Sequence, residues 1–282
     1  MQTLKPSRLD ALLAMLSPAA RHGTGPLARL IQQGAFHCLF QPLADLREGK
    51  TYAHEALIRG PRETAFHTPD VLLDLACQEG ILQDFELLCA FTALDNWGKL
   101  GAPGRLFVNI SADALVHGVS LCSAQQLGRW MRGFGFNARS LVLEITEHER
   151  VTDIPALRQA IKELHACGVR LALDDFGDGR SSLRLWSEIK PDFVKIDKYF
   201  IRDISAHPEN LQMLQAIKGI ASVFGTTLIA EGIETRDDLR ALRDLGIPFG
   251  QGWLLGRPAL VHREMADGPA LEVMHDRRVA VL

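Results

Sequence analysis

The 282-residue sequence lacks three features that mark common classes of protein. Its five cysteines stand singly and form no CxxC pair, which excludes a classical zinc module and a dense disulfide framework. No apolar run approaches the ~20 residues that a membrane-spanning helix needs. The 31 basic side chains do not outnumber the 34 acidic ones, so no basic face for duplex nucleic acid is expected. We therefore expect a cytoplasmic protein with no membrane span in this chain.

Short apolar runs alternate along the chain with longer stretches of helical periodicity. Helices are predicted over 153–166, 208–224 and 236–245, the last with Thr235 as its N-cap and Gly246 at its end. Strands that alternate with helices indicate a parallel sheet, and eight such runs indicate closure into a (β/α)₈ barrel. The strand-like runs are 38–42, 54–58, 106–110, 141–145, 169–174, 193–196, 227–230 and 248–253.

The two ends of the chain depart from this alternation. Residues 1–25 are predicted to be a lead-in, and the leucines between positions 9 and 16 have the spacing of a short amphipathic helix. The barrel domain is predicted over 26–262. The remaining residues, 263–282, are predicted to form a tail or a terminal helix.

Polar side chains recur where the strand-like runs end. Because the C-terminal strand ends of such a barrel face one pocket, these side chains are predicted to converge. Each could instead have a local role: Asp175 and Glu234 could cap helices, Asn109 could be a turn residue, and Lys195 could pair with Asp197 on the surface. Several carboxylates brought together would repel one another, so a positive charge is expected among them. The strand-end residues are Glu55, Asn109, Glu144, Asp174, Asp175, Lys195, Glu231 and Gln251.

The chemistry of these side chains indicates which metal could supply that charge. They offer carboxylate and amide oxygens without an accompanying cysteine or histidine, and hard oxygen ligands favour Mg²⁺ or Mn²⁺ over zinc. The adjacent Asp174 and Asp175 could bridge two ions, and paired ions are the usual device for in-line attack on a phosphodiester. Lys195 could hold or deprotonate the attacking water, or offset charge in the transition state.

Motifs in a fixed order along most of the chain resemble one family. They are Gln41-Pro42, HEALIRG at 54–60, FVNIS at 107–111, LEITE at 143–147, LDDFGDGRSSL at 173–183, VKID at 194–197, IAEGIET at 229–235 and QGWLLGRP at 251–258. Together they resemble the EAL domains, which are phosphodiesterases that hydrolyse cyclic di-GMP, and they cover roughly residues 27–260. The resemblance implies an α/β fold, a modified TIM barrel with one antiparallel strand near its start, and linear pGpG as the product.

The resemblance also implies a set of metal ligands. Lys195 would lie beside the attacking water, and either Lys195 or Glu231 would be the general base. Two Mg²⁺ or Mn²⁺ ions would act together, whereas Ca²⁺ is expected to inhibit because its looser ligand shell positions water poorly. The implied ligands of the first ion are Glu55, Asn109, Glu144 and Asp174, and those of the second are Asp174, Asp175 and Glu231.

Other motif residues would bind the substrate or support the site. Arg59 would pair with a phosphate, and Glu147 would anchor the loop that follows Asp175. Asp197 and Glu234 would support the same loops. The implied substrate contacts are Gln41, Leu57, Arg59 and Gln251.

Two further hypotheses about function stay open at this point. The chain could be a catalytically silent receptor for cyclic di-GMP, or a protein-binding regulator, although such proteins usually lose the ligands that are retained here. A homodimer is also implied, with a contact in the stretch 176–190 that contains Leu183, Leu185 and Trp186. Trp186 could instead pack against the barrel of its own subunit.

Overall fold

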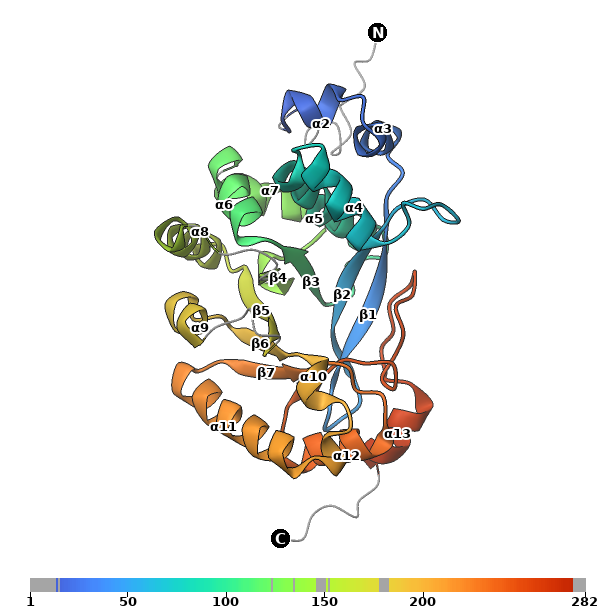
Figure 1. Cartoon of the computed structure of the whole chain (residues 1–282), viewed down its shortest axis with the longest axis vertical. Coiled ribbons are helices and arrows are strands. Elements are labelled where there is room, and N and C mark those ends of the chain that lie inside the picture. The colour runs from blue at the N-terminus through green and yellow to red at the C-terminus, as the bar shows by residue number, and fades with distance from the viewer. Residues whose placement is uncertain are drawn as a thin grey trace.

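Eight strands follow one another in chain order around a closed barrel, with helices on its outside (Figure 1). The computed structural model describes residue 14, residues 16–122, 124–133 and 135–145, residue 151, and residues 153–177 and 183–275. The strands are β1 (His37–Asp45), β2 (Thr51–Arg59), β3 (Arg105–Ile110), β4 (Leu141–Ile145), β5 (Arg170–Phe176), β6 (Phe193–Ile196), β7 (Thr227–Ala230) and β8 (Phe249–Gly250).

The first strand gives the barrel its departure from the regular pattern. β1 runs antiparallel to both of its neighbours, β2 and β8, whereas each of the other neighbouring pairs is parallel. The expected antiparallel strand near the start is thereby confirmed. The eighth strand is shorter than the predicted run 248–253, because the chain turns at Gly252, whose φ of 159° lies outside the usual range for a residue with a side chain.

The helices that cover the barrel begin and end where the sequence signals predict. Asp153 caps α8 by accepting a hydrogen bond from the backbone N–H of Ala156, and Thr235 caps α12 in the same way. Gly225 ends α11 with a left-handed φ of 68°. The α-helices are α2 (Pro18–His22), α3 (Pro26–Gln33), α4 (Pro69–Gln78), α5 (Leu82–Lys99), α6 (Ala112–Leu121), α7 (Ala124–Gly133), α8 (Ile154–Ala166), α9 (Leu183–Ile189), α10 (Lys198–Ile201), α11 (Pro208–Phe224), α12 (Arg236–Asp244) and α13 (Gly268–His275).

A small apolar layer fills the interior of the barrel. Each strand from β1 to β7 contributes one buried side chain to it, and the two aromatic rings among them, Phe107 and Phe193, pack edge to face with centroids 5.4 Å apart. A larger apolar layer lies between the strands and the surrounding helices. The interior layer consists of Leu43, Ala53, Phe107, Val142, Ala172, Phe193 and Ile229.

The larger apolar layer settles the position of Trp186. Its ring is fully buried between Phe176 and Phe224, and its indole N–H donates to the Thr226 hydroxyl over 3.1 Å. The hypothesis of Trp186 at a two-fold interface is therefore wrong, because this side chain is already enclosed by its own subunit. Leu183, by contrast, is half exposed at the start of α9.

A short helical segment before β1 docks onto the end of α4. In α3 the first backbone N–H groups, those of Leu27 and Ala28, donate to the Glu79 carboxylate at the end of α4. The leucine-rich helix predicted between positions 9 and 16 lies almost entirely outside the described residues; of its leucines only Leu16 is described, and it is buried. No helix in the described part of the chain has the length and apolar character needed to cross a membrane.

Candidate active site

The polar strand-end residues form a layer directly above the interior apolar layer. In β2 to β7 each polar residue lies two positions after an apolar one, as Glu55 follows Ala53 and Lys195 follows Phe193. Because side chains alternate across a strand, both members of each pair point into the barrel. The same register brings Glu55, Asn109, Glu144, Asp174, Lys195 and Glu231 together at the C-terminal end of the parallel strands.

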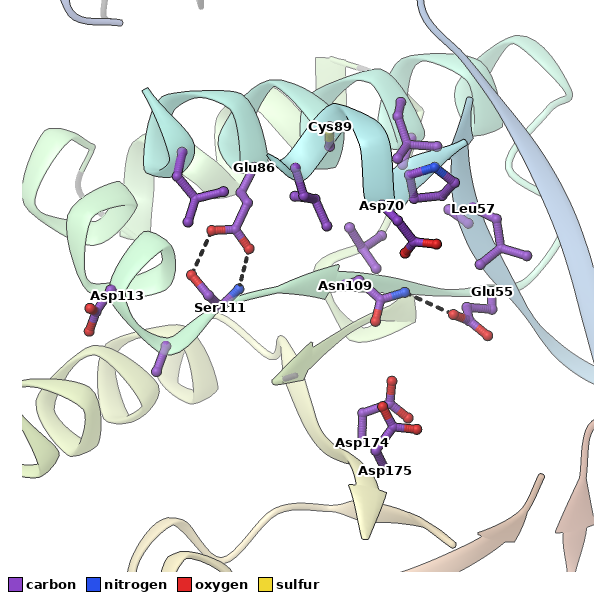
Figure 2. Close-up of a pocket in the computed structure, with 18 of the residues that line it drawn as sticks. Glu55, Leu57, Asp70, Glu86, Cys89, Asn109, Ser111, Asp113, Asp174 and Asp175 are labelled. Carbon is purple, nitrogen blue, oxygen red and sulfur yellow. Dashed lines mark hydrogen bonds between the residues drawn. The ribbon is translucent and has the colours of Figure 1, made fainter. Parts of the chain in front are cut away.

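A cavity of about 440 Å³ opens beside this layer, between the barrel mouth and helices α4, α5 and α6 (Figure 2). Glu55, Asn109, Asp174 and Asp175 lie at its base, and Leu57, one of the predicted substrate contacts, lines its wall. The rest of the wall mixes apolar residues with carboxylates. The cavity therefore joins the polar layer to a space with both apolar and acidic surfaces.

Glu86 is a cavity residue that the sequence reasoning missed. It lies on α5, and its carboxylate accepts hydrogen bonds from the backbone N–H and the hydroxyl of Ser111 at 2.8 and 2.6 Å (Figure 2). Only 9% of its surface is exposed. A buried acid on an otherwise apolar helix face was the available signal, because such residues are rare without a partner.

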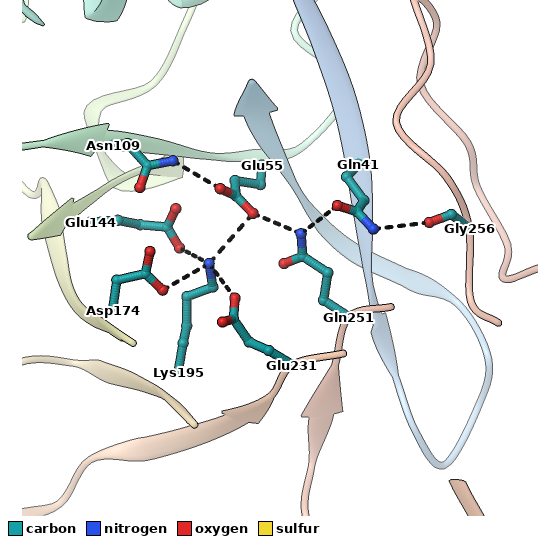
Figure 3. A network of polar contacts seen from close by, with 9 residues as sticks. All are labelled: Gln41, Glu55, Asn109, Glu144, Asp174, Lys195, Glu231, Gln251 and Gly256. Carbon is teal, nitrogen blue, oxygen red and sulfur yellow. Dashed lines mark hydrogen bonds and ion pairs between the residues drawn. The ribbon is translucent and has the colours of Figure 1, made fainter. Parts of the chain in front are cut away.

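Lys195 occupies the centre of the polar layer (Figure 3). Its ammonium lies 2.6 Å from Glu231, 3.0 Å from Glu144, 3.1 Å from Asp174 and 3.4 Å from Glu55. Burial alone would lower its pKa, but the four carboxylates outweigh burial and raise the pKa of Lys195 well above its usual value. The alternative of a surface pair with Asp197 is wrong, because Lys195 is only 1% exposed.

A chain of amides fixes the position of Glu55. Asn109 donates to one of its oxygens over 2.8 Å, and Gln251 donates to the other over 2.6 Å (Figure 3). The same Gln251 nitrogen donates to Gln41, which in turn donates to the backbone oxygen of Gly256. Burial would raise the pKa of Glu55, but Lys195 and the two amides outweigh burial and hold it below the usual value. Glu55 is thus held as an oriented carboxylate.

Glu144 and Glu231 are the two acids of the layer whose pKa is raised, because burial disfavours their charge and the layer holds more acids than Lys195 can balance. Apart from Lys195, neither oxygen of Glu144 has a hydrogen-bond donor among the described residues, although the side chain is fully buried. Burial and the neighbouring carboxylates raise its pKa well above the usual value. The same causes raise the pKa of Glu231 to about 8. A single lysine does not balance this many buried acids, so the site favours further positive charge.

An irregularity in β5 brings two adjacent aspartates to the same site. The pairing of β5 with β6 shifts register between Leu173 and Phe176, and Asp175 has a left-handed φ of 49°. Without such a bulge, neighbouring residues of a strand would point to opposite faces. Carboxylate oxygens of Asp174, Asp175 and Glu231 consequently lie within 4.8 Å of one another. This all-oxygen group, with the Glu144 carboxylate in the same polar layer, fits a divalent cation of the Mg²⁺ or Mn²⁺ type.

The remaining predicted site residues lie around this centre. Arg59 is half-buried, and its guanidinium donates to the Ile58 backbone oxygen over 2.7 Å. The Asp197 side chain caps α10. Its backbone N–H donates to the Phe176 backbone oxygen, and this hydrogen bond links the end of β6 to the residue that follows Asp174 and Asp175. Glu234 lies further out, 3.5 Å from the exposed Arg202. Glu147 lies outside the described residues.

Comparison with known proteins places this site in a family. A model of the EAL domain matches residues 25–258. This chain belongs to the EAL domain family. The fold and the family expected from the motifs are both confirmed, and the glutamate, alanine and leucine that give the family its name are Glu55, Ala56 and Leu57 of β2.

Curated relatives of this EAL domain include named phosphodiesterases. It is 31% identical over 229 residues to a cyclic di-GMP phosphodiesterase of Pseudomonas aeruginosa, and 29% identical over 233 residues to PdeA of Escherichia coli, a probable cyclic di-GMP phosphodiesterase. These matches cover 80% and 81% of this chain. The chain spans only 38% and 31% of the length of those two relatives.

Solved structures show the same architecture. BlrP1 of Klebsiella pneumoniae, solved as a complex with manganese and cyclic di-GMP, is similar with a TM-score of 0.73 and 27% identity over 82% of this chain and 58% of that chain. The PaMucR phosphodiesterase in complex with cyclic di-GMP gives a TM-score of 0.71 and 26% identity over 83% of this chain and 95% of that chain.

Proposed function

We propose that this chain is a phosphodiesterase that hydrolyses cyclic di-GMP to linear pGpG with two divalent cations, Mg²⁺ or Mn²⁺. The observation that carries the proposal is the polar layer itself, in which one lysine and five acids converge on a cavity at the barrel mouth. Membership in the EAL family and the printed names of the relatives support cyclic di-GMP as the substrate.

The residues divide into two sets of metal ligands that share one aspartate. When bound, the two cations would lower the pKa of a water molecule and offset negative charge on the phosphate oxygens. The amides of Asn109 and Gln251 would keep Glu55 in its ligating orientation. The proposed ligands are Glu55, Asn109, Glu144 and Asp174 for one ion, and Asp174, Asp175 and Glu231 for the other.

Lys195 and Glu231 form the pair that would handle the water proton. Their charged atoms lie 2.6 Å apart, so a proton accepted by the Glu231 carboxylate, or by Lys195 in its neutral form, can be shared through one hydrogen bond. The ammonium would also stabilise the charge that develops on the phosphate. Arg59 would pair with a phosphate oxygen. Leu57, which lines the cavity wall, would contact the substrate.

The test is a direct assay of the purified protein with cyclic di-GMP and Mg²⁺, Mn²⁺ or Ca²⁺, with pGpG measured by chromatography. We expect product with Mg²⁺ or Mn²⁺ and little with Ca²⁺. The variant Glu55→Gln should lower turnover on the order of 10²-fold or more, because it removes an anionic ligand. Glu48→Gln is the matched control, since Glu48 is exposed and its carboxylate pairs with the similarly exposed Lys50.

A binding titration with cyclic di-GMP beside this assay distinguishes the two competing functions. Binding of cyclic di-GMP without product would identify a catalytically silent receptor, and absence of binding would favour a protein-binding regulator. Either result would contradict the proposed hydrolase. The retention of all seven proposed catalytic and ligand residues argues against both alternatives, because neither needs a lysine at the centre of buried carboxylates.

A further inference from the structure

Helix α4 separates the cavity at the barrel mouth from a second apolar cluster. Its other face buries Leu72 and Ala76 in that cluster, among residues of α2, α3 and α5. Figure 1 shows α2 and α3 beyond α4 and α5, on the side away from the strands. The position of this cavity wall therefore depends on packing against α2 and α3. The cavity-lining residues of α4, which share one face of the helix, are Pro69, Asp70, Leu73, Asp74 and Cys77.

The Glu79 carboxylate joins the end of α4 to the start of α3. One of its oxygens accepts the Leu27 N–H over 2.8 Å, and the other accepts the Ala28 N–H over 3.1 Å. Both donors belong to the first turn of α3, where backbone N–H groups have no partner within the helix and the helix dipole favours a negative charge. The approach is so close that a Cβ at Gly25 would overlap the Glu79 carboxylate. The contact is thus specific to a carboxylate on α4 and a glycine before α3.

Glu79 lies at the junction of the two helices that form the cavity wall. Across the turn that contains it, the Ile81 N–H donates to the Ala76 oxygen over 2.9 Å, and α5, which also lines the cavity, begins at the next residue. A second carboxylate, that of Asp84 in the first turn of α5, is only 6% exposed and accepts the Ser17 N–H over 3.2 Å. The segment that contains α2 and α3 is therefore fastened to both wall helices.

Glu79 can affect a ligand in the cavity only through α4, because it is not one of the cavity-lining residues. The proposed metal ligands lie on the strands and at their ends, where the barrel ladder holds them. Release of α3 would therefore disturb the wall more than the catalytic centre. A ligand binds more weakly when only a fraction of the protein has the binding-competent arrangement, and its apparent affinity falls in proportion to that fraction.

We propose that Glu79 is a positioning residue for substrate binding, which fastens α3 to α4 and so fixes the α4 wall of the cavity. This inference rests on the proposed function and adds control of KM by the segment 16–34. Loss of the Glu79 contacts should raise KM for cyclic di-GMP by up to roughly 5-fold, the factor that corresponds to a typical capping interaction. It should leave kcat within about twofold, because no group at the reacting atoms changes.

The first experiment measures kcat and KM for two variants that break this contact from opposite sides. Glu79→Ala removes the acceptor on α4. Gly25→Ala leaves all charges in place, because Gly25 has an ordinary φ of −65° and the new Cβ only displaces the carboxylate. We expect KM to rise in both variants, and to rise less in Glu79→Gln, which keeps one acceptor oxygen.

Matched controls separate this effect from a change at any neighbouring position. Gln78→Ala alters an exposed side chain next to Glu79 that does not line the cavity. Gly219→Ala adds a Cβ where it would meet nothing within 4 Å. Both controls should keep the KM of wild type. Circular dichroism at the assay temperature establishes that each variant is folded.

The second experiment does not depend on turnover. The Kd of cyclic di-GMP is measured by calorimetry in Ca²⁺, and amide hydrogen exchange is followed in α4, with the remote α12 as an internal reference (Figure 1). In Glu79→Ala and Gly25→Ala we expect Kd to rise by the same factor as KM. The α4 amides should exchange faster than in wild type, and saturating cyclic di-GMP should restore their protection. A purely structural role would lower Tm without this matched change in KM and Kd.

The outcomes distinguish this proposal from the proposed function. Faster exchange in α3 with unchanged KM and Kd would overturn the positioning role and leave the hydrolase intact. A rise in KM in Glu79→Ala but not in Gly25→Ala would also overturn it, because the effect would not come from the contact between α3 and α4. Absence of cyclic di-GMP binding and hydrolysis in the wild type would overturn the proposed function, and this inference with it.

Discussion

The Lys195 ammonium lies 2.6 Å from the Glu231 carboxylate, the shortest of the four ion pairs that this buried lysine makes. The lysine therefore has a structural role in addition to any role in catalysis. It is the common partner of carboxylates from four different strand ends, and without it their mutual repulsion would act directly on the barrel mouth.

Replacing Lys195 with methionine should make the fold depend on divalent cations. The change leaves three buried carboxylates and the partly exposed Glu231 without their common counter-charge, and loss of a buried ion-pair partner costs about 3–5 kcal/mol. We expect Tm to fall by several degrees in EDTA and to recover partly in Mn²⁺, as followed by circular dichroism. Lys198→Met, which alters an exposed lysine three residues later, is the control. A Lys195→Met protein with the Tm of wild type in EDTA would contradict this structural role.

The strands and the polar layer follow from local patterns, and for that reason the sequence predicts them well. The predicted runs 141–145, 193–196 and 227–230 agree with β4, β6 and β7. A polar residue two positions after a buried apolar one, as in Phe193 and Lys195, indicates a strand that passes from the packed interior to the mouth. Such a pattern can be recognised from the residues immediately before and after it in the sequence.

Other features depend on contacts between distant segments, and a local sequence pattern does not identify the partner in such a contact. Glu86 reaches the cavity because α5 packs beside the end of β3, where Ser111 binds it. Trp186 is buried because α11 brings Phe224 against it. Gln41 is predicted to contact substrate, and the structure adds that its side-chain oxygen accepts a hydrogen bond from Gln251, a residue 210 positions away. In each case the direction of a side chain is decided by an element remote in sequence.

Replacing Glu79 with alanine should loosen the docking of α3. The variant removes the acceptor for the first two N–H groups of that helix, and loss of a capping interaction costs about 1 kcal/mol. We expect a small fall in Tm together with faster proteolytic cleavage before residue 34. Glu79→Gln, which keeps one acceptor oxygen, should fall between wild type and Glu79→Ala. Equal cleavage rates for wild type and Glu79→Ala would show that this carboxylate does not hold α3 in place.

The dimer implied by the family resemblance can now be tested at Leu183 rather than at Trp186. Leu183 is 50% exposed at the start of α9. A charge placed there in a two-fold contact would repel the same charge on the partner subunit, because a two-fold contact contains each residue twice. We expect light scattering to give a dimer for wild type and a monomer for Leu183→Glu. Met213→Glu is matched in exposure, because Met213 is also 50% exposed, and it should remain dimeric. A monomeric wild type at micromolar concentration would contradict the dimer.

Asp192 should make stability depend on pH through its contacts at the base of β5. Its carboxylate accepts the Leu171 N–H over 2.9 Å and lies 3.3 Å from the His165 ring. Burial would raise its pKa, but the hydrogen bonds from His165 and Leu171 and the charges of His165 and Arg170 outweigh burial and hold the pKa below its usual value. A carboxyl with a lowered folded pKa stabilises the fold above its unfolded pKa of about 3.9, and this contribution is lost as pH falls through the lower folded value.

The variant Asp192→Asn tests that sign. Near neutral pH we expect it to lower the free energy of unfolding by about 0.5–1 kcal/mol, because the carboxylate is partly exposed and screened by solvent. Urea unfolding from pH 7 to pH 3 should show the difference from wild type shrinking below about pH 4, where the wild-type carboxyl becomes protonated as well. Asp237→Asn, which removes an exposed pair with Arg240, should give a difference near zero throughout. A difference for Asp192→Asn that stays constant from pH 7 to pH 3 would mean that charge is not the source of its contribution.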